Sequence, residues 1–255
     1  MAERAFLKRL PDSERWRLDA EVDGLARLAE AGAIRVPRVL GQGTSGGESW
    51  IQLEFFDLRV ADARSDAHMG AALAGLHAVT GSRYGLDRDN AIGATLQRNA
   101  PCDVWPDFWR ERRLAFQLDL ASENGHRGRL QDRGRRLLER IPAFFRGYRP
   151  LPSLLHGDLW AGNRAMLADG TPVIFDPAVY YGDREADLAM TRLFGGFGAR
   201  FYEAYAAEWP LDAGADARAD LYNLYHALNH LNLFGGSYRA LAESMIDRLL
   251  AASGG

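Results

Sequence analysis

Oxygen-bearing side chains that could support phosphoryl transfer lie at the ends of two short apolar runs in the second half of the sequence. Asp158 and Asn163 follow the first run, and Asp176 follows the run at 173–175. Carboxylate and carboxamide oxygens bind Mg²⁺, and a carboxylate can orient an attacking hydroxyl group. Phosphoryl transfer needs these groups because positioning and charge neutralisation lower most of its barrier. The residue types therefore favour a phosphoryl-transfer centre between His156 and Asp176.

The spacing of these residues supports the same chemistry. His156, Asp158 and Asn163 keep the order and spacing of the kinase catalytic loop, H-x-D-x-x-x-x-N. By that pattern Asp158 is the base, Asn163 a metal ligand and Asp176 the second metal ligand. The alternative is that the aspartates form turns at strand ends and Asn163 caps a loop, since turns favour these residues. Three required residues at kinase spacing favour the catalytic interpretation.

The first part of the chain predicts a small α/β unit. It opens on a short apolar strand, continues with an amphipathic helix that stops at Gly32, and returns as two strands joined by a turn-rich segment. The predicted strands lie at 5–8, 38–41 and 49–56, and the predicted helix lies at 15–31.

The rest of the chain is dominated by helical periodicity. Helices are predicted at 66–80, 105–122, 130–145, 199–208, 217–233 and 240–251, and strands at 153–156, 163–167 and 172–175. We therefore expect an α+β fold with an N-lobe at 1–57 and a helical lobe at 58–255 that carries the catalytic segment 155–190. Residues 83–101 form the longest stretch without periodicity, and such stretches are often functional.

Composition narrows the classes of partner. The net charge of −3 excludes a general attraction to nucleic acid or to anionic membranes, and no apolar run approaches the length of a membrane span. With Cys102 as the single cysteine, no intrachain disulfide can form. A cytoplasmic protein is expected, with no membrane or nucleic-acid partner. Oligomeric state is not readable from the sequence.

Lys8 is the only lysine among 31 basic side chains. A tight phosphate site distinguishes the compact ammonium of lysine from the wide guanidinium of arginine, so position 8 is a candidate for phosphate binding. Chance survival of one surface lysine is the competing explanation, and composition alone does not choose between them.

The chain resembles the fructosamine kinase, or ketosamine 3-kinase, family. The resemblance rests on His-Gly-Asp-Leu-Trp-Ala-Gly-Asn at 156–163 and on Phe-Asp-Pro-Ala-Val-Tyr-Tyr-Gly-Asp-Arg-Glu-Ala-Asp-Leu-Ala-Met at 175–190. Trp160 and the stretch 181–185 distinguish these motifs from those of the broader aminoglycoside and choline kinases. Further matching segments lie at 84–85, 89–93, 97, 107–109, 112 and 229–236. The resemblance implies a protein-kinase-like fold of two lobes.

The resemblance also implies a reaction and further site residues. Its members use ATP and Mg²⁺ to phosphorylate the carbon-3 hydroxyl of ketosamines, on small molecules or on glycated amines. It implies that Lys8 holds the α- and β-phosphates, that Glu21 is the ion-pair partner of Lys8, and that Glu54 and Phe56 form the hinge that meets adenine.

Two residues are candidate substrate contacts. Trp160 could stack on the sugar or on the amine substituent, although a buried core role competes with that interpretation. Asp183 follows the metal ligand on a turn and is the second candidate. Asp187 is expected instead to tie the catalytic segment to the helical lobe.

The front of the chain departs from the family pattern. Members carry about two more strands and a glycine-rich loop before the lysine strand, whereas this chain begins seven residues ahead of Lys8. The segment Gly41–Gly46 matches G-x-G-x-x-G by letter but follows Lys8, so we interpret it as a hairpin turn. We expect a native start upstream of Met1. The alternatives are a truncated chain and a weakly active nucleotide-binding protein, and a kinase of another small alcohol is the alternative within the class.

Overall fold

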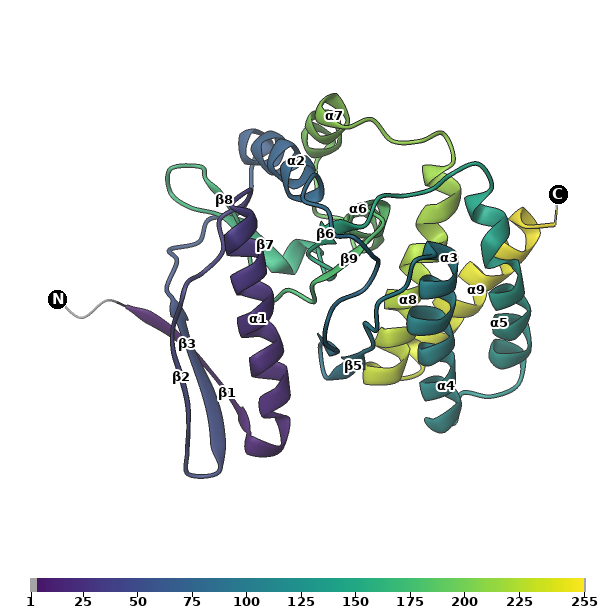
Figure 1. Ribbon diagram of the computed structural model, residues 1–255, viewed down its shortest axis with the longest axis horizontal. Helices are drawn as coiled ribbons and strands as arrows, with labels where there is room; N and C mark the ends of the chain where they lie inside the picture. Colours follow the sequence, from purple (N-terminus) through teal and green to yellow (C-terminus); the bar gives the residue numbers. More distant parts are fainter. Residues whose placement is uncertain (1–3, 255) are drawn as a thin grey trace.

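The computed structural model describes residues 4–254, which form a small sheet-bearing lobe beside a larger helical lobe (Figure 1). The small lobe contains β1 (Ala5–Pro11), α1 (Arg15–Ala31), β2 (Val39–Ser45) and β3 (Glu48–Glu54). Its antiparallel sheet has the order β1-β3-β2, with Lys8 paired opposite Ile51. The helix α1 lies between this sheet and the rest of the molecule, so residues on α1 can face the cleft.

The helix α1 has the predicted bounds. Leu18, Leu25 and Leu28 are its buried leucines, and Gly32 ends the helix in the left-handed conformation at φ 65°. The strands differ from the prediction because β2 continues to Ser45, and only the pair Gly46 and Gly47 makes the turn. Both of these glycines have positive φ, as a two-residue hairpin turn of type I′ requires. The glycine-rich segment is thus mostly strand, and the predicted hairpin turn is confined to Gly46 and Gly47.

The large lobe is mainly helical, and short strands are inserted between its helices. Its helices are α2 (Ala63–His77), α3 (Trp105–Phe108), α4 (Phe116–Glu123), α5 (Arg129–Arg140), α6 (Glu185–Leu193), α7 (Ala199–Glu208), α8 (Ala215–Phe234) and α9 (Ser237–Ala252). Its strands are β4 (Asn90–Ile92), β5 (Thr95–Gln97), β6 (Ser153–Leu155), β7 (Arg164–Met166), β8 (Pro172–Ile174) and β9 (Tyr180–Gly182). Within residues 4–254, no helix is long and apolar enough to cross a membrane.

Three differences from the predicted helices have local causes. A π-helical segment, Trp109–Ala115, joins α3 to α4 within the predicted helix at 105–122. The helix predicted at 130–145 becomes a 3₁₀ helix from Ile141, because Pro142 cannot continue an α-helix. The helix α6 was not predicted from the sequence. Seven of its nine residues are buried, so the sequence does not show the separate apolar and polar faces that mark a surface helix.

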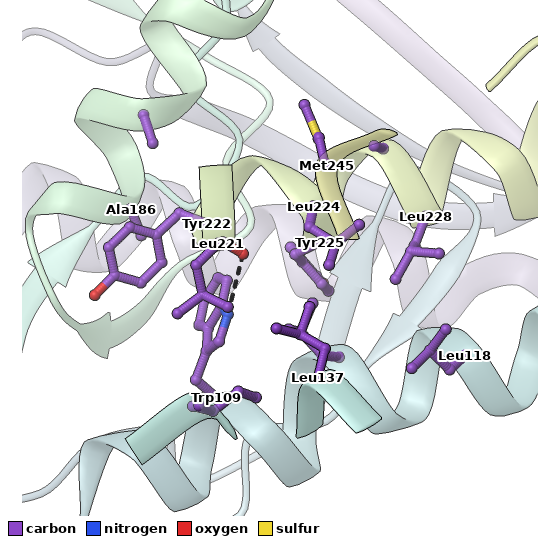
Figure 2. Close-up of a cluster of buried hydrophobic side chains, with 14 of the residues drawn as sticks. Trp109, Leu118, Leu137, Ala186, Leu221, Tyr222, Leu224, Tyr225, Leu228 and Met245 are labelled. Atoms are coloured by element: carbon purple, nitrogen blue, oxygen red, sulfur yellow. Dashed lines mark hydrogen bonds between the residues drawn. The ribbon is translucent and has the colours of Figure 1, made fainter. Parts of the chain in front are cut away.

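The core is divided into two buried clusters. One lies among α4, α5, α8 and α9, where Trp109 donates from Nε1 to the carbonyl of Leu221 at 3.4 Å (Figure 2). The other joins the two lobes, because Leu25 and Ile51 share it with Ile174. This shared cluster fixes α1 and β3 relative to the strand that precedes Asp176.

Two short antiparallel strand pairs position the catalytic segments. β6 pairs with β9 and β7 pairs with β8, both antiparallel. The loop between β6 and β7 therefore carries residues 156–163, and the loop between β8 and β9 carries 175–179. An isolated bridge between Arg35 and Val173 links the β7–β8 hairpin to the small lobe.

Candidate active site

The backbone of the catalytic loop is held by one buried carboxylate. Asp187, on α6, accepts hydrogen bonds from the backbone N–H of His156 at 2.8 Å and of Gly157 at 2.9 Å. Its Oδ2 also lies 3.2 Å from Nε2 of His77 on α2. The prediction that Asp187 ties the catalytic segment to the helical lobe is confirmed.

His156 links the two catalytic loops through its ring. Its Nδ1 accepts from the backbone N–H of Asp158 at 3.2 Å, so Nε2 carries the proton and donates to the carbonyl of Phe175 at 3.0 Å. Burial lowers the pKa of His156, which keeps the ring neutral in this arrangement. His156 is thus a positioning residue that fixes Asp158 relative to the segment before Asp176.

Asp158 and Asn163 lie in direct contact. The Asn163 side-chain amide donates to the backbone carbonyl of Asp158 at 2.9 Å and to its carboxylate at 3.2 Å. Burial raises the pKa of Asp158 to about 7. The backbone N–H of Phe175 donates to the carbonyl of Asn163 at 3.1 Å, which brings Asp176 to the same side. Among residues 4–254, Asp176 is the single non-glycine residue with positive φ, at 56°. Such backbone strain clusters at functional sites.

Gly157 is required by the close approach of the two catalytic loops. It has φ +83°, and a Cβ on it would overlap the carbonyl oxygen of Ala178. We expect Gly157→Ala to lower the free energy of unfolding by about 3 kcal/mol or more, because the left-handed backbone and the overlap both cost energy. Urea unfolding measures this change.

Gly170→Ala is the matched control for that prediction. Gly170 has φ +85°, and a Cβ on it would have no other atom within 4 Å, so its substitution isolates the backbone cost of about 1–2 kcal/mol. Equal losses for the two variants would contradict the proposed contact between the loops.

Lys8 brings the small lobe to this centre. Its ammonium lies 2.6 Å from Oε1 of Glu21 on α1 and also contacts the carboxylate of Asp176. Burial opposes the charge of Lys8, but the two carboxylates outweigh it and raise the pKa of the ammonium. The structure therefore joins the lone lysine, the helix glutamate and Asp176, which are distant in the sequence.

Two cavities meet at Lys8 and Asp176, which line both. The first, of about 340 Å³, also contains Asp158, Trp160 and Asn163. The second, of about 310 Å³, is more apolar. Its walls include the predicted Glu54 and Phe56 and four apolar residues that sequence reasoning missed: Phe6, Phe55, Leu58 and Phe175. Phe6 could have been found from the sequence, because it lies two residues from Lys8 in the same strand and therefore on the same face of the sheet.

The side chain of Glu54 is engaged on the small lobe. Its carboxylate pairs with Arg35 at 2.6 Å and contacts Arg38, and its backbone N–H donates to the carbonyl of Arg38 at 2.8 Å. The prediction that backbone groups at Glu54 and Phe56 meet adenine does not involve this side chain.

The irregular stretch 83–101 forms a wall of the first cavity. It contains the β4–β5 hairpin, and Ala91 and Gly93 line the cavity. Asn90 and Gln97 anchor the hairpin by donating to the carbonyls of Val179 at 2.7 Å and Ala178 at 2.9 Å. Arg17, which the sequence did not single out, lines the cavity and donates from Nε to the carbonyl of Gly93 at 3.0 Å.

The two candidate substrate contacts have different outcomes. Trp160 is 40% exposed at the cavity, so the buried-core alternative is wrong. Asp183 is fully buried, and its carboxylate accepts from Tyr148 at 3.0 Å and from Tyr222 at 2.5 Å. Its assignment as a substrate contact is therefore corrected: Asp183 is a structural residue enclosed by tyrosines, because α8 packs over it.

A candidate base, two metal-ligand candidates and a paired lysine, held between a small sheet-bearing lobe and a helical lobe, define a kinase of the protein-kinase-like class. The chain belongs to the fructosamine kinase family, whose model matches residues 1–252. The predicted family and α+β fold are confirmed.

Individual relatives agree with this family. The chain is 44% identical over 250 residues to a Synechocystis protein named "Probable ketoamine kinase", covering 97% of this chain and 84% of the relative. It is 41% identical over 236 residues to the Arabidopsis thaliana protein-ribulosamine 3-kinase, covering 91% and 72% of the two chains. A solved Haemophilus somnus structure named for fructosamine-3-kinase has a TM-score of 0.89 and 33% identity, covering 98% of this chain and 84% of that one.

Proposed function

We propose that this kinase transfers the γ-phosphoryl group of ATP to the carbon-3 hydroxyl of a ketosamine. The convergence of Lys8, Asp158, Asn163 and Asp176 on one cavity carries the proposal. The names of the relatives, ketoamine kinase and protein-ribulosamine 3-kinase, indicate the acceptor class. In this proposal the two lobes are residues 1–57 and 58–255. Residues from both lobes line this cavity and its apolar neighbour.

Asp158 is the proposed catalytic base. Its carboxylate accepts the proton of the sugar hydroxyl as the hydroxyl oxygen forms a bond to the γ-phosphorus and the bond to the ADP oxygen breaks. Lys8 contributes positive charge to the α- and β-phosphates, and Glu21 holds its ammonium in place. The apolar cavity with Phe56 is the proposed adenine site, and the backbone at Glu54 is the proposed hinge contact.

The residues present also fit Mg²⁺. Asp176 supplies a carboxylate, and the Asn163 amide nitrogen donates to Asp158, which leaves its amide oxygen as a ligand. When bound, the ion neutralises charge on the phosphates. Trp160 offers its exposed ring to the sugar or to the amine substituent.

A substrate panel tests this function. With ATP and Mg²⁺, we expect turnover of fructosyl-lysine or ribulosyl-lysine and none of an aminoglycoside or of choline. Titration of Mg-ATP by calorimetry accompanies the assay, so that binding without turnover is recognised. Preferential turnover of the aminoglycoside or choline, or nucleotide binding without turnover of any acceptor, would overturn the proposal.

A further inference from the structure

One face of α1 carries two charged side chains that reach two different parts of the cleft. Arg17 and Glu21 are four residues apart, so they lie one above the other on the helix, and both line the first cavity. Glu21 holds the ammonium of Lys8, which is the proposed contact to the phosphates. Arg17 donates from Nε to the carbonyl of Gly93 at 3.0 Å. The same helix face therefore touches both the proposed phosphate contact and the wall formed by the β4–β5 hairpin.

The hairpin wall belongs to the acceptor side of the cleft. Ala91 and Gly93 line the first cavity together with the candidate base, Asp158, and with Trp160. The cavity proposed for adenine has other walls, among them Phe56. A sugar whose hydroxyl reaches the candidate base therefore shares its cavity with the hairpin.

Arg17 links α1 to the turn of this hairpin. Its guanidinium also pairs with Glu14, just before the helix begins. Gly93, at φ +61°, belongs to the turn between β4 and β5. The opposite end of the hairpin is anchored by the side chains of Asn90 and Gln97. The turn is thus the end far from these anchors, and Arg17 restrains it.

The middle of α1 rests against the loop that carries Asp176. A Cβ on Gly24 would lie 3.0 Å from the Cγ atom of Pro177, so the helix and this loop are in close contact. Glu21 lies between this contact and Arg17 along the helix. Its carboxylate is therefore held in position from both directions.

The ammonium of Lys8 is shared between two carboxylates, those of Glu21 and Asp176. Asp176 is also a candidate metal ligand, and a bound metal ion would compete with the ammonium for it. Glu21 would then orient Lys8 alone. The position of Glu21 on α1 therefore matters most when the nucleotide is bound.

We propose that Arg17 is a positioning residue that couples acceptor binding to nucleotide binding. This inference rests on the proposed function. An acceptor in the first cavity restrains the turn at Gly93, and Arg17 passes this restraint to α1. Glu21 then keeps Lys8 in place for the phosphates. Each ligand binds more tightly when the other is present, because the coupling of two binding sites is reciprocal.

The affinity for Mg-ADP, which this reaction cannot use as a phosphoryl donor, tests the coupling. Calorimetry measures its Kd with and without saturating glycated Nα-acetyl-lysine. In the wild type we expect the acceptor to lower this Kd by a factor of about five to ten. Arg17→Met removes the donor to Gly93 and should reduce the factor to about one or two. Arg17→Lys, whose ammonium can donate to the same carbonyl, should restore it to about three.

Arg15→Met is the matched control. Arg15 is two residues from Arg17, on a different face of α1, and pairs with Asp19 at 3.5 Å on the surface. Its substitution removes the same side chain from the same helix without touching the hairpin. The factor should therefore stay at the wild-type value.

The outcomes separate the two proposals. A factor of one or no measurable Mg-ADP binding in the wild type, or an unchanged factor in Arg17→Met, overturns the inference and leaves the proposed function standing. If Arg17→Met weakens binding of the acceptor alone by about fivefold or more, Arg17 is a direct acceptor contact, and the coupling role is overturned as well. Absence of turnover of the same acceptor with ATP and Mg²⁺ overturns the proposed function itself.

Discussion

Asp158→Asn is expected to lower kcat for ketosamine phosphorylation by about a thousandfold. The carboxamide has nearly the shape of the carboxylate but cannot accept the proton of the sugar hydroxyl. Nucleotide binding should change little, because Lys8, Asn163 and Asp176 remain. Steady-state kinetics with a glycated lysine, together with calorimetric titration of Mg-ATP, separates the chemical step from binding.

The same variant has an expected effect on stability that depends on pH. Burial raises the pKa of Asp158 to about 7, so the folded protein binds a proton there more tightly than the unfolded chain does. The stability that this group contributes is therefore lost as pH rises from the unfolded pKa to about 7. The difference in the free energy of unfolding between Asp158→Asn and the wild type should therefore shift in favour of the variant as the pH rises from 5 to above 7.

The control for Asp158→Asn is Asp216→Asn. Asp216 is exposed on α8 and pairs with Arg192, so its substitution should leave kcat and the pH profile of stability close to those of the wild type. Retention of a tenth or more of wild-type kcat in Asp158→Asn would remove Asp158 from the role of base.

Lys8→Arg is expected to lower kcat/KM for ATP by about a hundredfold although the positive charge is retained. The ammonium of Lys8 contacts both Glu21 and Asp176. A planar guanidinium is wider and has a fixed arrangement of donors, so it cannot occupy the same point. The measurement is the dependence of initial rate on ATP concentration.

A double-mutant cycle shows whether Glu21 acts through Lys8. We expect Glu21→Gln to impair ATP use less than Lys8→Arg, and the double variant to resemble Lys8→Arg alone, because the role of Glu21 is to hold the ammonium. Arg59→Lys, at an exposed pair with Asp57, is the control for exchange of the two basic side chains. Full additivity of the two substitutions would show that Glu21 contributes independently of Lys8.

Much of the catalytic centre could be predicted because its signals are local. The positions of His156, Asp158 and Asn163 follow from spacing within one loop, and the bounds of α1 follow from apolar side chains that repeat with the helical period. The strands β4, β5 and β9 were not predicted, because polar residues or glycine occupy part of each three-residue strand. The strands β6 and β8 are equally short, but adjacent aliphatic residues mark them.

The sequence by itself determined the family, the candidate base, the metal-ligand candidates and the lysine, since these are residue types at set spacings or the single instance of a type. Only the tertiary structure decided what surrounds them. It enclosed Asp183 between tyrosines from two segments and left Trp160 open at the cavity. It also brought the ring of Phe194 to 6.4 Å from the ring of that tryptophan, measured between centroids. Burial and cavity shape depend on contacts between segments far apart in the chain, and no local pattern records them.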